Sequence, residues 1–200
     1  SAFAATRGKL LPRPWVIDDL DRMVCKVTAK NAEGSSCTCT YSKAVLCVDN
    51  AGSDVVLGML PLARELLKAG CEVVLGANGM PSCNDVTAEE LSGLLASVGD
   101  LDSVMGAAFS DRRLRVVATH DERLPVIDLS QLSEEMVSET ASAQLLVLEG
   151  MGRAVESNLY ARFQGIDVWK LGMIKHQPVA DGLRGRMYDC VCKFDEAVCV

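Results

Sequence analysis

The chain has 200 residues, of which 49% are hydrophobic, and its formal net charge is −7 at pH 7. This length suits one domain with a sizeable buried core, or one domain with an appendage, and no apolar run reaches the roughly 18 residues of a membrane span. No cluster of lysine and arginine stands out, which argues against nucleic acid as a partner.

The cysteines indicate a reduced, cytoplasmic protein. There are nine, an odd number, and several lie inside apolar stretches typical of buried strands. Cys37 and Cys39, and likewise Cys190 and Cys192, are separated by a single residue, whereas common zinc sites have wider spacing. We therefore predict buried thiols and disfavour a cysteine zinc site.

The first 42 residues follow no regular apolar period. We expect a short helix after Pro14 and a polar loop insertion over residues 29–42. The N-terminus lacks the long apolar stretch of a secretory signal. Because the chain starts at Ser1 and not at Met, we expect a fragment or a processed product. The sequence thus predicts an irregular N-terminal segment over residues 1–42 and an α/β domain over residues 43–200.

From Lys43 onward, apolar stretches rich in valine and leucine alternate with helical patterns. Strands are predicted at 43–48, 71–77, 114–119, 144–150, 167–175 and 188–194, with a short extended piece at 125–129. Helices are predicted at 54–69, 84–99, 133–143 and 153–163. This alternation indicates βαβ units, and strands without polar alternation are typical of a sheet covered on both faces. The sequence therefore predicts a three-layer, Rossmann-like α/β domain with a largely parallel sheet.

Two helices carry recognisable end signals. Ser53 is a candidate N-cap and Gly70 a candidate C-terminal cap of the helix at 54–69, and Pro61 within it predicts a kink or break. Thr87 and Glu90 have the spacing of a capping box. Both helices are thus expected to start shortly after a strand.

The strand at 43–48 ends on Asp49 and Asn50, and Gly52 lets the backbone turn closely into the next helix. Asp85 follows the second strand. Ligands of open α/β sheets bind beyond the carboxyl ends of the strands, where helix N-termini also favour phosphate. Two carboxylates and an amide oxygen suit a hard cation, and in a chain with only two histidines Mg²⁺ or Mn²⁺ suits them best. Each aspartate could equally serve as an ordinary helix cap.

Cationic side chains stand at two further strand ends. The segment 149–153, Glu-Gly-Met-Gly-Arg, places two glycines and Arg153 at a predicted helix start, which suits an anion. A dinucleotide fingerprint is incomplete there because Val155 replaces the third glycine. Lys175 ends another strand and can neutralise a phosphoryl oxygen. Alternatively, Arg153 forms a surface ion pair and Lys175 is an ordinary strand-end lysine.

The four strand ends are predicted to share one edge of the sheet. There the acids could hold a metal ion, and the cations and helix N-termini could hold a phosphate group. This combination of residue types indicates metal-assisted phosphoryl chemistry.

Residues 48–91, 148–163 and 170–176 closely resemble the metal-dependent damage-control phosphatases, once described as domain of unknown function 89. The resemblance is to the branch with a Glu-Gly-Met-Gly-Arg motif, and it extends from about residue 11 to the C-terminus. That branch includes the C-terminal phosphatase domain of pantothenate kinase fusion proteins and free-standing plant relatives. Full-length relatives carry a substantial N-terminal helical region, which we expect to be missing here.

The resemblance implies that Asp49, Asn50 and Asp85 ligate a divalent metal, with Mn²⁺, Co²⁺ or Ni²⁺ supporting activity and Mg²⁺ as a further candidate. It implies hydrolysis of small phosphorylated metabolites, notably 4′-phosphopantetheine or its oxidised forms, or sugar phosphates, in damage control linked to coenzyme A synthesis. The expected catalytic residues are Asp49, Lys175 and Arg153. The expected phosphate-binding residues are Gly52, Ser53, Asn78, Gly150, Gly152 and Lys175, and the family motif comprises Glu149, Gly150, Met151, Gly152 and Arg153.

Other functions stay open at this point. A truncated domain could bind a phosphorylated metabolite without turning it over. A nucleotide-cofactor enzyme would need the glycine that Val155 replaces. Asp49 could also act as a nucleophile, although Ala51 and Ser53 occupy the positions that aspartyl-phosphate phosphatases fill with aspartate and threonine.

Overall fold

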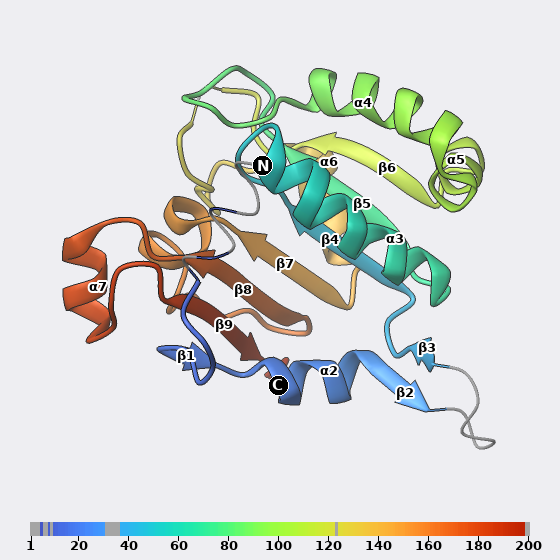
Figure 1. Ribbon diagram of the computed structural model, residues 1–200. Helices are drawn as coiled ribbons and strands as arrows, with labels where there is room; N and C mark the ends of the chain where they lie inside the picture. The colour runs from blue at the N-terminus through green and yellow to red at the C-terminus, as the bar shows by residue number, and fades with distance from the viewer. Residues whose placement is uncertain (1–4, 6–7, 9, 31–36, 123, 199–200) are drawn as a thin grey trace.

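The computed structural model describes residues 5, 8, 10–30, 37–122 and 124–198. Its centre is a seven-stranded sheet with the order β1-β9-β8-β7-β4-β5-β6 (Figure 1). The strands are β1 (Ile17–Asp18), β4 (Lys43–Cys47), β5 (Glu72–Ala77), β6 (Leu114–Ala118), β7 (Leu145–Glu149), β8 (Asp167–Met173) and β9 (Cys190–Asp195). Neighbouring strands are parallel, apart from the antiparallel pair β8 and β9. The predicted α/β class with a largely parallel sheet is therefore confirmed.

Helices pack on both faces of this sheet. One face carries α2 (Leu20–Val27), α3 (Leu60–Lys68), α4 (Ala88–Leu101) and α5 (Ser103–Ser110), and the other carries α6 (Glu134–Ala141) and α7 (Gln177–Leu183). Two π-helical segments, η1 (Val55–Met59) and η2 (Met151–Glu156), follow β4 and β7. A separate antiparallel pair is formed by β2 (Thr28–Lys30) and β3 (Cys37–Cys39). The result is the expected three-layer arrangement.

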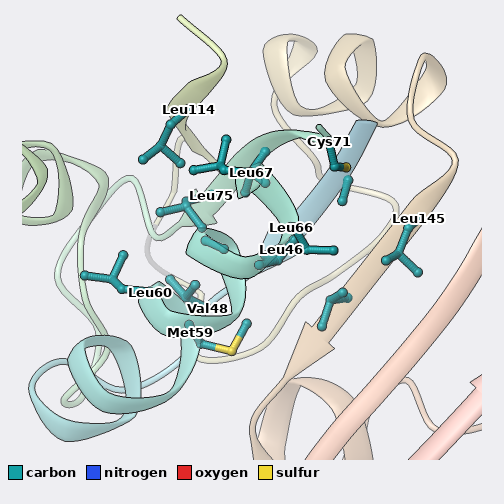
Figure 2. Close-up of a cluster of buried hydrophobic side chains, with 14 of the residues drawn as sticks. Leu46, Val48, Met59, Leu60, Leu66, Leu67, Cys71, Leu75, Leu114 and Leu145 are labelled. Atoms are coloured by element: carbon teal, nitrogen blue, oxygen red, sulfur yellow. The ribbon is translucent and has the colours of Figure 1, made fainter. Parts of the chain in front are cut away.

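The buried side chains form two clusters, one on each face. On β4, Ala44 and Leu46 join the cluster beneath α3, whereas Val45 and Cys47 join the cluster on the opposite face. Figure 2 shows the first cluster, in which Leu66 of α3 lies close to Leu46. Because apolar surface is buried on both sides, the strand needs no polar alternation, as the sequence predicted.

Two predicted helix ends are confirmed. The Thr87 hydroxyl accepts a hydrogen bond from the Glu90 N–H at 3.2 Å, and the Glu90 carboxylate accepts one from the Thr87 N–H at 2.9 Å. Gly70 has a φ of +90° after α3, a conformation that glycine adopts without strain. However, α4 begins at Ala88 rather than near residue 84, because Asp85 forms an isolated bridge with Asn50.

The helix predicted at 54–69 starts differently. Ser53 is not its N-cap, since it already lies in a helical turn and its hydroxyl donates to Asp54 at 3.4 Å. The helix begins as η1 and becomes α-helical only at Leu60. Pro61 lies in the first turn of α3, where its missing N–H leaves no hydrogen bond unmade.

The helix predicted at 153–163 is wrong beyond its first turn. The Ser157 hydroxyl donates to the Gly152 carbonyl at 2.7 Å, and the Asn158 amide donates to the Arg153 carbonyl at 2.8 Å. These side chains occupy carbonyls that a continuing helix would use, so η2 ends at Glu156. The buried ammonium of Lys170 then holds the following turn by donating to two of its carbonyls.

Several short elements were not predicted. They are β1, β2 and β3 in the segment expected to be irregular, and α5 and α7 further along the chain, whereas α2 is the short helix expected after Pro14. Residues 31–36 of the predicted insertion lie outside the described residues, and residues 125–129 form no strand. Within the described part of the chain, no helix combines the length and the hydrophobicity of a membrane span. The described cysteines, among them Cys190 and Cys192, are free thiols.

Candidate active site

Four strands of the sheet end at the same edge because they run parallel. Asp49 lies two residues beyond β4, Asn78 directly follows β5, Glu149 is the last residue of β7, and Lys175 lies two residues beyond β8. The Asp49 backbone N–H donates to Glu149 Oε2 at 3.0 Å, which joins the ends of β4 and β7. The edge predicted from the sequence therefore exists.

Arg153 connects these strand ends from inside the protein. Its side chain is fully buried. Nη1 donates to the Val48 carbonyl at 2.8 Å, while Nη2 donates to Asn78 Oδ1 at 2.7 Å and to Asp85 Oδ2 at 2.6 Å. Nε lies 3.3 Å from Asp49 Oδ1. The alternative of a surface ion pair is wrong, because the guanidinium is enclosed by the acids and carbonyls that it holds.

One donor of this guanidinium is left without an aligned acceptor. Among the described residues, Arg153 Nε is a buried polar atom with no hydrogen bond, although Asp49 Oδ1 is near enough for an ion pair. Asp49 is therefore attracted to Arg153 without being fixed by it. The Asp49 carboxylate thus keeps acceptor capacity for another cation.

The acids at this edge carry more negative charge than Arg153 balances. Burial raises the pKa of Asp49 to about 6; the Arg153 charge opposes this rise and the nearby Asp85 charge adds to it. Burial also raises the pKa of Glu149 to about 7, and the Asp49 charge adds to that rise. A further positive charge at this position would favour the ionised form of both groups.

A second set of polar contacts surrounds Asn50 at the start of η1. Its amide donates to Asp54 Oδ2 at 2.7 Å, and Asn84 donates to its Oδ1 at 2.7 Å. Asp54 Oδ2 also lies 3.9 Å from Lys175 Nζ. The Lys175 side chain is 46% exposed, so its ammonium can reach a ligand arriving from solvent. Sequence reasoning missed Asp54, although an aspartate one turn after Asn50 on a helix start is a visible signal.

The remaining predicted residues lie around the same turns. Gly52, with a φ of +79°, and Ser53 form the first turn after β4. Gly152 lies inside η2, and the Met151 sulfur accepts a hydrogen bond from the Lys175 N–H at 3.3 Å. Gly52 and Ser53 thus present backbone N–H groups at a helix start, which suits an anion.

Gly150 approaches Asp49 more closely than any residue with a side chain could. It has a φ of +113°, and a Cβ built on it would lie 2.1 Å from Asp49 Oδ2. Backbone contact with a carboxylate therefore requires glycine at this position. The glycine after Glu149 is explained by the packing of Asp49.

Gly150→Ala is expected to destabilise the protein more than Gly165→Ala. Gly165 also has a positive φ, of +72°, but nothing lies within 4 Å of its hypothetical Cβ, so its replacement brings only backbone strain of about 1–3 kcal/mol. Gly150→Ala adds a clash that displaces Asp49. Chemical denaturation of both variants measures the difference, and equal losses would contradict the packing argument.

The oxygen atoms at this edge are of the kind that hard divalent cations prefer. A backbone bridge between Asn50 and Asp85 brings the Asn50 amide close to the Asp85 carboxylate. The Asp49 carboxylate lies near enough to interact with Asp85 as well. Both hydrogen bonds to Asp85 from described residues, those of Arg153 and Asn78, end on Oδ2, so Oδ1 can face a cation. No group of three or more His, Cys, Asp or Glu side chains suited to a metal is found among the described residues. A site with two carboxylates suits ions such as Mg²⁺ that keep waters or bind substrate oxygens.

Comparison with known proteins places the chain in a family. Residues 3–191 match the damage-control phosphatase ARMT1-like domain. A damage-control phosphatase of Arabidopsis thaliana is 45% identical over 195 residues, covering 98% of this chain and 50% of its own length. Pantothenate kinase 2 of Oryza sativa subsp. japonica is 42% identical, covering 94% of this chain and 22% of its own length. A 4′-phosphopantetheine phosphatase of Mus musculus is 26% identical, and the match covers 96% of this chain and 28% of the mouse protein.

The fold is shared with a solved structure of a family 89 protein from Pyrococcus horikoshii. The TM-score is 0.59 at 18% sequence identity, and the match covers 90% of this chain and 53% of the other. The chain thus spans about half the length of the Arabidopsis relative and of the solved structure. With the family match over almost its whole length, the chain belongs to the damage-control phosphatases of the ARMT1-like family.

Proposed function

We propose that this protein hydrolyses small phosphate monoesters in a metal-dependent reaction. The substrate class that we favour is 4′-phosphopantetheine or its oxidised forms, ahead of sugar phosphates, in metabolite damage control linked to coenzyme A synthesis. Family membership and the mouse relative named a 4′-phosphopantetheine phosphatase support this. The structural observation that carries the proposal is the convergence of Asp49 and Asp85 on Arg153 at the carboxyl edge of the sheet.

The proposed metal ligands are Asp49, Asn50 and Asp85. Phosphatases of this family are generally metal-dependent. The oxygen donors suit Mn²⁺, Co²⁺ or Ni²⁺, with Mg²⁺ as an alternative. When bound, such an ion polarises a phosphoryl oxygen and makes water a stronger nucleophile at neutral pH.

The cationic residues take two different roles in this proposal. Lys175, which is half exposed and near Asp54, binds a phosphoryl oxygen of the substrate. Arg153 is buried and uses its Nη atoms on Val48, Asn78 and Asp85, so it positions the acids instead of touching the substrate. The N–H groups of the turn at Gly52 and Ser53 supply further donors to the phosphate.

Water is the proposed nucleophile. Asp49 is held beside the Gly150 backbone and near the Arg153 guanidinium, which suits a ligand more than an attacking group. For Asp49 to attack in place of water, its carboxylate would need a free path from this enclosed position to the phosphorus atom.

The decisive experiment is hydrolysis of p-nitrophenyl phosphate and 4′-phosphopantetheine with each of Mn²⁺, Co²⁺, Ni²⁺ and Mg²⁺. We expect phosphate release that requires a divalent ion and stops on chelation. Lys175→Met should raise KM because one phosphate-binding charge is lost, whereas Lys68→Met, an exposed lysine at the end of α3, should not. Phosphate binding without turnover under all four metals would contradict the proposal and favour a binding module.

A further inference from the structure

A groove of about 310 Å³ opens beside the site, on the face of the sheet that carries α2 and α3. Its lining includes Trp169, Leu171 and Met173 of β8, and Cys190 of β9. Glu149, which accepts the hydrogen bond from the Asp49 N–H, borders the same groove. The volume lies at the lower end of the roughly 300–1,000 Å³ typical of small-molecule sites. Glu149 thus lies between the groove and Asp49 of the candidate site.

The lining is apolar because of strand geometry. Alternate residues of β8 face the same side of the sheet, so Trp169, Leu171 and Met173 form one row about 13 Å long. The antiparallel pairing sets Cys190 opposite Met173 and Cys192 opposite Leu171. Burial raises the pKa of both thiols, which keeps them uncharged. Glu149 is the charged residue at the border, and the row leading away from it is neutral.

The helices on this face leave part of the row accessible. In Figure 1, α3 lies over β4 and β5, while α2 lies beyond β9. Leu171, Met173 and Cys190 are consequently only half-buried. Trp15, whose indole donates to the Leu11 carbonyl at 3.0 Å, closes the groove on the side of β1.

We propose that this groove binds the non-phosphate part of the substrate, and that this part is a slender, uncharged chain of up to about 13 Å. The inference rests on the proposed function and deepens it, because it selects a substrate class. An extended chain with methylene, amide and thiol groups, as in pantetheine, can bury apolar surface along β8. A sugar phosphate is compact and polar, and would leave the half-buried Leu171 and Met173 facing water.

Binding of the chain can be tested without catalysis. The protein has two tryptophans, Trp15 and Trp169, and both line the groove, so intrinsic fluorescence reports on it directly. Pantetheine, which lacks the phosphate, is expected to give a saturable fluorescence change in the absence of metal. Cys190→Phe, which fills the groove, should abolish this change. Cys25→Phe, the same substitution at an exposed position on α2, should retain it.

Substrate preference provides the second measurement. We expect Cys190→Phe to lower the ratio of kcat/KM for 4′-phosphopantetheine to that for glucose 6-phosphate at least about tenfold, as for other pocket-filling changes. Circular dichroism would reveal whether Cys190→Phe is folded. If it is not, Leu171→Phe replaces it in both measurements, because this substitution adds less volume. Cys25→Phe should keep the wild-type ratio.

The outcomes separate this inference from the proposed function. Absence of hydrolysis in the wild type would contradict the proposed function, while the pantetheine titration would still show whether the groove binds pantetheine. Fluorescence that does not respond to pantetheine at millimolar concentration would overturn the inference. It would also be overturned by fluorescence that changes only with protein concentration, because a second copy would then cover the groove.

Discussion

Replacing Arg153 with methionine is expected to lower the free energy of unfolding by about 3–5 kcal/mol, because buried acids then lose their cation. Arg153 donates to Asp85 at 2.6 Å and to Asn78 at 2.7 Å, and lies 3.3 Å from Asp49. Without it, two carboxylates face each other where water screens them poorly. Guanidinium unfolding, followed by circular dichroism, measures the loss.

The control for this variant is Arg162→Met, at an exposed position after η2, which should change stability by less than about 0.5 kcal/mol. Arg153→Lys is expected to recover part of the stability and little activity. One ammonium cannot replace a planar guanidinium that serves the Val48 carbonyl, Asn78 and Asp85 together. A loss below about 1 kcal/mol for Arg153→Met would show that the acids do not depend on it.

Asp49→Asn is expected to reduce metal-dependent hydrolysis at least about 100-fold while the fold is kept, because one of the two proposed carboxylate ligands loses its charge. Metal should raise the melting temperature of the wild type by mass action, and should do so much less for the variant. Phosphate release and thermal melts with and without Mn²⁺ measure both effects. Asp100→Asn, at an exposed position on α4, is the matched control.

The same variant has an expected signature in the metal-free protein. Folding raises the pKa of Asp49 from 3.8 to about 6 and that of Glu149 from 4.5 to about 7. The folded state therefore binds more protons than the unfolded state, and the associated stability is complete below about pH 4 and lost by about pH 7. Asp49→Asn should flatten this fall and be more stable than the wild type near pH 7.5. If the variant hydrolysed substrate at the wild-type rate and metal raised its melting temperature as much as that of the wild type, Asp49 would not belong to the site.

Much of the candidate site could be predicted because its residues follow strands directly. The apolar stretch before Asp49 marks a strand end, and so does the stretch before Asn78. Parallel strands bring their carboxyl ends to one edge, which is a rule of topology and needs no coordinates. Asp54 and Asn84 were missed because their contacts with Asn50 depend on how two separate turns meet.

The burial of Arg153 could not be predicted. A helix at 153–163 would have allowed an exposed arginine, and the observed η2 turns it inward instead. That π-helical turn ends where Ser157 and Asn158 bond to its carbonyls, and the Asn158 amide also reaches the Ile127 carbonyl from a distant segment. Such contacts between remote segments leave no periodic signal in the local sequence.

The sequence by itself determined the strands β4, β5, β6, β7 and β8, the capping box at Thr87 and the acids at the sheet edge, because apolar period, cap chemistry and strand-end position are local properties. Only the tertiary structure decided that the two residues of β1 pair with β9, that Arg153 lies between Asp49 and Asp85, and that β8 borders an open groove. The physical reason is that short strands, buried charges and grooves gain their stability from packing between segments far apart in the chain.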